Sequence, residues 1–196
     1  MLKFATLSCV AIGGLVVAAL AAETSRTPPA ANAGPALAGA VFSADGTLQR
    51  PVDYRLWQFV STGLGMSYGP AAQAAALTGH VMFDNVFVQP QAYKTFLQTG
   101  SWLEGTMFVL ELRGTETQRP PNNRGYFQTD LHGVEVSVKD SRRFKDRWAY
   151  FDFGMDARTA NPEPNANCFA CHAAHAAVDM TFVQFYPTLQ NVKAAK

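Results

Sequence analysis

Apolar and polar side chains alternate over several short stretches between residues 81 and 153, which is the period of a β-strand with one buried face. The runs at 81–88 (VMFDNVFV) and 106–113 (TMFVLELR) are also rich in β-branched and aromatic residues. We therefore predict strands at 81–88, 106–113, 134–138 and 148–153, with a fifth at 125–129. Short connections between them favour an antiparallel sheet.

Helical spacing of apolar residues marks other stretches. The clearest is 91–98, where Tyr93, Phe96 and Leu97 fall on one side and Gly100 follows. Further helices are predicted at 51–60 after Pro51 and Asp53, at the Ala-rich 71–77, and at 173–185 before Pro187. These patterns predict an α+β fold, a mostly antiparallel β-sheet with flanking helices, in a single domain of about 155 residues.

The N-terminal residues have the pattern of an export signal. Lys3 gives a positive start, residues 7–20 are apolar, and Ala19-Leu20-Ala21 is a small-x-small cleavage signal. We predict a signal peptide over 1–21 and a periplasmic location; an uncleaved membrane anchor is the alternative. Residues 22–40 are rich in Ala, Pro, Asn and Gly, which predicts a disordered leader before a folded domain over 41–196.

The charge balance gives no sign of a nucleic-acid partner. The chain has 16 Lys and Arg against 15 Asp and Glu, and removal of residues 1–21 takes away one Lys and no acid. The basic stretch 139–147 (KDSRRFKDR) has interleaved acids, which is typical of a solvated loop or helix face; a docking patch is the alternative.

The region near residue 170 holds the motif that carries chemistry. Cys168-Phe169-Ala170-Cys171-His172 is a C-x-x-C-H run, which in an exported protein is the attachment site of a c-type haem. The thiols lie one helical turn apart and can form thioethers to the porphyrin vinyl groups, while the imidazole can ligate the iron. We therefore predict one covalent haem c, with Cys168 and Cys171 as tethers and His172 as proximal ligand. Cys9 leaves with the signal peptide, so no structural disulfide is expected.

Two other interpretations use the same residues. A redox dithiol also has the C-x-x-C spacing, but it normally opens a helix after a strand in a βαβ unit, and no such unit surrounds residue 168. A zinc site could combine Cys168, Cys171, His172 and His175, but the adjacent Cys171 and His172 point in different directions on a helix.

A longer set of residues resembles a known family. The run HVMFDNVFVQPQAYKTFLQTGSWLEGTMFVLELR, then VEVSVKDSRRF, a strand beginning at Trp148, the C-x-x-C-H motif and DMTFVQFYPTL are similar, in this order, to the cytochrome P-460 family, which includes the cytochromes c′-beta. The likeness covers roughly residues 42–190. It implies a periplasmic mono-haem protein with a mostly antiparallel β fold, commonly a homodimer. Some members oxidise hydroxylamine and others bind nitric oxide.

Two positions bear on the choice between these activities. The resemblance aligns Leu110 with the Lys that forms an additional covalent bond to the porphyrin in the hydroxylamine-oxidising members, and leucine cannot form it. This favours the cytochrome c′-beta branch. The oxidising members can also use a distal carboxylate in the loop before the haem motif, where this chain has Glu163. Glu163 is thus a candidate proton acceptor; an exposed loop acid is the alternative.

Strand alternation suggests what lies beside the haem. Phe108 shares a face with Leu110, and Phe83 shares a face with Phe87 on the neighbouring predicted strand. If Leu110 lies by the porphyrin, then Phe83, Phe87 or Phe108 is a candidate aromatic lid that leaves room for a small diatomic ligand. The alternative is that each is an ordinary core aromatic.

A sixth protein ligand would change the function. The available side chains are His80, His132, Met66, Met82, Met107 and Met155. Met107 has the opposite parity to Leu110 and is predicted to point away. We therefore expect a protein that binds nitric oxide or a related small nitrogen ligand. A hydroxylamine or nitric oxide oxidoreductase and a six-coordinate electron-transfer cytochrome are the alternatives, and the sequence identifies no redox partner.

Overall fold

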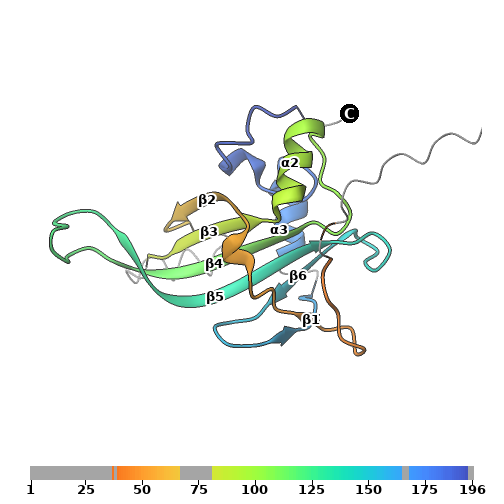
Figure 1. Ribbon diagram of the computed structural model, residues 1–196, viewed down its shortest axis with the longest axis horizontal. Coiled ribbons are helices and arrows are strands. Elements are labelled where there is room, and N and C mark those ends of the chain that lie inside the picture. The colour runs from red at the N-terminus through yellow and green to blue at the C-terminus, as the bar shows by residue number, and fades with distance from the viewer. Residues whose placement is uncertain (1–36, 38, 67–80, 165–167, 194–196) are drawn as a thin grey trace, which may run out of the picture. The chain divides into compact units, whose positions relative to one another are not determined.

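The computed structural model describes residues 37, 39–66, 81–164 and 168–193 (Figure 1). The predicted signal peptide, most of the predicted leader, the predicted helix at 71–77 and His80 lie outside the described residues. Leu37 and Ala40, at the end of the predicted leader, pack against the hydrophobic core.

The core element is one antiparallel sheet. In chain order the elements are β1 (Leu48–Gln49), the 3₁₀-helix η1 (Tyr54–Leu56), β2 (Gln58–Leu64), β3 (Phe83–Val88), α2 (Pro90–Thr99), β4 (Met107–Glu116), β5 (Phe127–Lys139), β6 (Trp148–Asp152), β7 (Thr159–Ala160), α3 (Cys168–His175) and the 3₁₀-helix η2 (Val183–Phe185). Strands β2 to β6 form a five-stranded sheet in sequence order, each antiparallel to the next, and β1 pairs with β7. The predicted α+β fold with a mostly antiparallel sheet is confirmed.

The register of the sheet separates two faces. On the closed face, Val109 of β4 lies opposite Phe87 of β3 and Val136 of β5. This face packs against β1, η1 and β7 through a cluster of Leu48, Tyr54, Met107, Val109, Val134, Val136, Val138, Ala149, Phe151, Phe153 and Ala160. Each of the large side chains contributes about 1.5–3 kcal/mol through removal of apolar surface from water.

The other face, which we call the cavity face, packs against the helices and the C-terminal segment. Its cluster contains Val60, Val88, Ala92, Phe96, Trp102, Phe108, Trp148, Tyr150, Val183, Tyr186 and Leu189, with Cys168 and Phe169 beside them. Figure 1 shows α2 and α3 on one side of the sheet, with β1 on the other. The sheet is thus covered by different segments on its two faces.

Helix α2 confirms the prediction at 91–98 and extends it by one residue at each end. Pro90 occupies the first turn, and Gly100 closes the helix in the left-handed conformation at φ 68°, with its N–H donating to the Phe96 carbonyl at 2.8 Å. Phe96 is fully buried and stacks on Trp102 with ring centroids 3.9 Å apart. This stack fixes α2 on the cavity face.

Three predicted element boundaries were wrong. The predicted helix at 51–60 is only the 3₁₀-helix η1, because Gln58 to Leu64 pair with β3 and sheet pairing outweighs the helix-start signal at Asp53. The strands predicted at 125–129 and 134–138 are one strand, β5.

The predicted helix at 173–185 ends at His175. Asp179 and Met180 follow in the left-handed region, with φ 42° and 63°, which a right-handed helix cannot accommodate.

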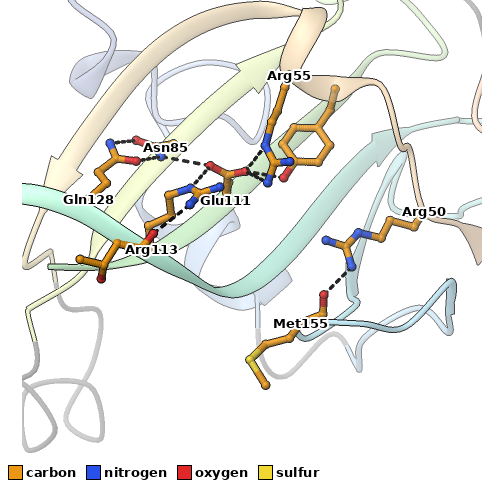
Figure 2. Close-up of polar contacts among 9 residues, drawn as sticks. Arg50, Arg55, Asn85, Glu111, Arg113, Gln128 and Met155 are labelled. Atoms are coloured by element: carbon orange, nitrogen blue, oxygen red, sulfur yellow. Dashed lines mark hydrogen bonds and ion pairs between the residues drawn. The ribbon is translucent and has the colours of Figure 1, made fainter.

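Polar groups on the closed face form one connected network (Figure 2). The carboxylate of Glu111, 3% exposed, accepts from the Tyr54 hydroxyl, from Arg55 Nε at 2.8 Å and from Arg113 Nε at 2.7 Å. The amides of Asn85 and Gln128 exchange hydrogen bonds of 2.7 and 2.9 Å beside it. Burial alone would raise the pKa of Glu111, but the bonds from Arg113, Tyr54 and Arg55 outweigh it and lower the pKa to about 2.

The basic stretch 139–147 is mostly an exposed turn. The Asp140 carboxylate accepts the backbone N–H groups of Arg142 and Arg143, both at 3.1 Å. Lys139 is the exception, because it is 5% exposed and lies on the cavity face. Across the part of the chain that the structure describes, no helix is long and apolar enough to span a membrane.

Candidate haem site

A cavity of about 410 Å³ lies between the cavity face of the sheet and the C-terminal segment. Its volume is within the range typical of cofactor pockets. Its walls come from β2 to β6, α3 and the residues around η2. The lining residues are Ser61, Gly63, Met66, Asp84, Val86, Phe108, Leu110, Glu135, Val136, Ser137, Tyr150, Cys168, Cys171, His172, Thr181, Phe182, Phe185 and Tyr186.

His172 is held in one orientation at this cavity. Its imidazole contacts the rings of Tyr150 and Phe182, with ring centroids at 4.5 and 4.4 Å. Nδ1 lies 2.6 Å from the Met180 carbonyl oxygen, which only accepts, so Nδ1 carries the proton and donates. Burial lowers the pKa of His172 despite this bond, which keeps the ring neutral. The neutral ring therefore keeps Nε2 as the nitrogen for a metal.

Both cysteines of the motif also line the cavity, and neither is in a disulfide. Burial raises the pKa of the Cys168 thiol to about 11, and the nearby Glu135 and Glu163 add to the effect. Redox-active dithiols have lowered thiol pKa values, because the thiolate is the reacting species. The raised pKa of Cys168 therefore argues against a dithiol activated for exchange.

The zinc alternative finds no support in the geometry. Among the described residues, no three His, Cys, Asp or Glu side chains converge closely enough to hold a metal ion. His175 is exposed at the end of α3, whereas His172 lines the cavity.

Tyr150 indicates that a polar group belongs in the cavity. Its side chain is 6% exposed, and its hydroxyl is buried without a hydrogen-bond partner in the structure. A buried hydroxyl without a partner costs about 1–3 kcal/mol, so such groups are rare in folded proteins. Burial raises the pKa of Tyr150, so the hydroxyl keeps its proton and can donate to a group bound in the cavity.

Two cavity carboxyls were missed by sequence reasoning. Burial raises the pKa of Asp84 to about 6. For Glu135, burial together with the charges of Asp152, Asp84 and Glu163 raises the pKa to about 7. The signal that could have found them is an acidic residue inside an otherwise apolar strand.

The predicted aromatic lid is only partly at the cavity. Phe108 and Leu110 line it, whereas Phe83 and Phe87 do not. The strand register explains the difference, since Leu110 lies opposite Val86 and Phe87 lies opposite Val109 on the closed face. Phe87 instead packs edge-on against Tyr54 and Phe59, at 5.6 Å in both cases.

Glu163 is not among the residues that line the cavity. Its backbone N–H donates to the Tyr150 carbonyl at 2.7 Å, and its neighbour Pro162 bridges to Phe151. The side chain is close enough to raise the pKa of Glu135. The proton-accepting role of Glu163 stays a prediction.

Among the described candidates for a sixth ligand, only Met66 lines the cavity. A Cβ added to Gly63 would lie 2.2 Å from the Met66 sulfur, so the glycine is what lets this side chain fold against β2. Met107 lies in the closed-face cluster, as its parity predicted, and Met155 is 54% exposed.

The residues present fit a haem. Cys168 and Cys171 would hold it through thioethers, His172 Nε2 would ligate the iron, and the Tyr150 hydroxyl would gain an acceptor. Phe108, Leu110 and Val86 supply apolar walls.

Such a fold and site define a haem-binding cytochrome built on an antiparallel sheet. A family model, Cytochrome P460, matches residues 51–183. The chain belongs to the Cytochrome P460 family, as the sequence resemblance indicated. A comparison with curated proteins gave no match.

Proposed function

We propose that the protein is a periplasmic mono-haem c-type cytochrome that binds nitric oxide or a related small nitrogen ligand. The observation that supports this most strongly is the state of His172, whose Nδ1 is engaged by the Met180 carbonyl while the ring lines a largely apolar cavity. A bound haem supplies an iron that accepts a small gas as a ligand. The export signal at 1–21 supports the periplasmic location and covalent attachment.

Several of the chain's own residues favour an uncharged ligand over a charged one. Phe108, Leu110 and Val86 present only hydrocarbon to the cavity. Leu110 also stands where the resemblance places the cross-linking Lys of the hydroxylamine-oxidising members, and leucine cannot form that bond. Both features favour a small apolar ligand over a substrate that needs charge stabilisation.

The test is the optical spectrum of the haem-loaded protein, ferric and reduced, before and after addition of nitric oxide. We expect a high-spin ferrous spectrum that changes with the gas. The matched pair is His172→Gly and His175→Gly, since both residues lie on α3 but only His172 lines the cavity. His172→Gly should lose the wild-type spectrum and recover it with added imidazole, and His175→Gly should keep it. A sharp low-spin spectrum that ignores the gas would instead indicate a sixth ligand, and Met66→Leu would then restore gas binding.

A second candidate function is oxidation of hydroxylamine or nitric oxide with an external electron acceptor. It is favoured by Asp84 and Glu135, whose pKa values of about 6 and about 7 suit a group that takes and returns protons near neutral pH. Glu135→Gln and Asp84→Asn should then each lower hydroxylamine turnover by 10²-fold or more. Asp156→Asn is the control, because that side chain is exposed and does not line the cavity. No turnover in the parent protein rules out this candidate.

A further inference from the structure

The segment that follows α3 has an unusual backbone. Val178 and Thr181 bridge to each other, with the Thr181 N–H donating to the Val178 carbonyl at 2.8 Å. Between them Asp179 and Met180 both have positive φ, at 42° and 63°. A methionine rarely adopts this conformation, because its Cβ crowds the following carbonyl. The surrounding structure must therefore hold this tight turn, which we call the proximal turn (Val178–Thr181).

A buried lysine is the main contact that holds it. Lys139, with a side chain 6% exposed, donates from Nζ to the Asp179 carboxylate at 2.6 Å and to the Trp102 carbonyl at 2.8 Å. Trp148 Nε1 donates to the other Asp179 oxygen at 3.2 Å. Arg147 reaches the same carboxylate only at 3.5 Å, and its side chain is 56% exposed. Lys139 and Trp148 are thus the buried donors to Asp179.

A second set of hydrogen bonds holds Thr181, at the other end of the proximal turn. Trp102 Nε1 donates to Thr181 Oγ1 at 2.9 Å, and that hydroxyl donates to the Val178 carbonyl at 2.6 Å. Trp102 therefore contacts the turn through its indole and contacts Lys139 through its carbonyl. The turn is fixed from β5, from β6 and from the segment after α2.

This arrangement fixes the position of the Met180 carbonyl group. Met180, adjacent to Asp179, directs its carbonyl oxygen to His172 Nδ1 at 2.6 Å. A hydrogen bond at the far nitrogen of a metal-ligating histidine fixes its tautomer and raises its basicity. A buried charge pair is expensive to form, so its placement beside this carbonyl calls for a role beyond packing.

We infer that Lys139, Asp179 and Trp148 are positioning residues that hold the Met180 carbonyl on His172 and thereby set the donor strength of the iron ligand. This inference rests on the proposed role of His172 as the proximal ligand. A strong donor favours ferric over ferrous iron and strengthens the bond between iron and histidine. The proximal turn therefore sets both the reduction potential of the protein and its affinity for a gas ligand.

The test compares Lys139→Met with Lys139→Arg in the haem-loaded protein. Methionine keeps the length of the side chain and removes its charge, so the Met180 carbonyl should shift away from Nδ1. We expect a lower iron–histidine stretching frequency by resonance Raman, a higher reduction potential and a change of about 10-fold in the dissociation constant for nitric oxide. Lys139→Arg should recover part of each change. Arg147→Met is the matched control, since it removes the exposed cation from the same carboxylate, and it should leave all three readouts unchanged.

Trp148→Phe provides a second variant in case Lys139→Met does not accumulate folded protein. This substitution keeps an aromatic ring and deletes the Nε1 donor to Asp179. The stretching frequency, the reduction potential and the dissociation constant should therefore shift in the same directions but by smaller amounts. At least one of these two variants should load haem. If it keeps the wild-type iron–histidine stretching frequency and reduction potential, the inference is overturned and the proposed function is left intact. A wild-type spectrum that survives His172→Gly would overturn both.

Discussion

Glu111 and Glu135 lie on neighbouring paired strands but on opposite faces of the sheet. Glu111 of β4 is opposite Val134, and Glu135 of β5 is opposite Leu110. Burial raises the pKa in both cases, yet the bonds from Arg113, Tyr54 and Arg55 lower the pKa of Glu111 to about 2. Glu135 faces Asp152, Asp84 and Glu163 instead, and its pKa rises to about 7.

The difference shows how to separate a structural carboxylate from a functional one. A carboxylate that is buried with two guanidinium groups and a phenol stays ionised and holds the strands together. A carboxyl group that is partly buried among other acids changes its charge near neutral pH, which costs stability and provides a proton donor or acceptor. Burial alone does not distinguish the two; the neighbours do.

The largest effect is expected from Glu111→Ala. Removal of the carboxylate leaves Arg113 and the Tyr54 hydroxyl without their buried partner, so the free energy of unfolding should fall by about 3–5 kcal/mol. Denaturant unfolding of the haem-loaded protein measures it. The visible spectrum should stay unchanged, because Glu111 lies on the closed face; a changed spectrum would show that the two faces are coupled.

Glu135→Gln is expected to raise the free energy of unfolding above neutral pH, whereas Glu111→Ala lowers it. The raised pKa means that the folded state holds a proton which the unfolded state releases above about 4.5. Wild-type stability is therefore lost as pH rises from about 4.5 to about 7, and the variant should lack this loss. At pH 8 the variant should be more stable by on the order of 2 kcal/mol. Asp156→Asn at an exposed position is the control, and a parallel pH profile for Glu135→Gln and wild type would contradict the comparison.

Tyr150→Phe tests whether the cavity supplies a partner for the buried hydroxyl. The ring contact with His172 is kept, so only the hydrogen bond to the bound group is lost. We expect the haem-loaded variant to be about 1 kcal/mol less stable to thermal unfolding. A variant that is more stable than wild type would mean that the hydroxyl has no partner even with haem bound.

The smallest effect is expected from Arg55→Ala. The Arg55 side chain is 55% exposed, so solvent screens its pair with Glu111 even at 2.6 Å. The loss should be at most about 1 kcal/mol, well below that of Glu111→Ala. Equal losses in the two variants would show that Arg55, rather than Arg113 and Tyr54, neutralises the carboxylate.

Local signals were enough to predict much of this molecule. The alternation in 81–88 and 106–113 and the Gly after α2 each depend on neighbouring residues, and each led to the right kind of element. The parity of Met107 against Leu110 also held.

What depends on the pairing of distant residues could not be predicted. Parity fixes which side chains of one strand share a face, but not which face of the next strand they join. Phe87 was therefore proposed as a candidate lid on the side of Leu110, whereas it pairs with Val109 on the closed face. The left-handed Met180 is a further case, since contacts from Lys139 and Trp102 to its neighbours hold it in place.

The sequence-ordered sheet has a consequence for how the protein matures. Each of β2 to β6 pairs with the strand next to it in the chain, so the sheet can form by successive local steps with a low cost in loop closure. The C-x-x-C-H helix comes after all of these strands. We therefore expect the sheet to form before α3 docks on β6, so that the two cysteines are still accessible for the proposed attachment of haem.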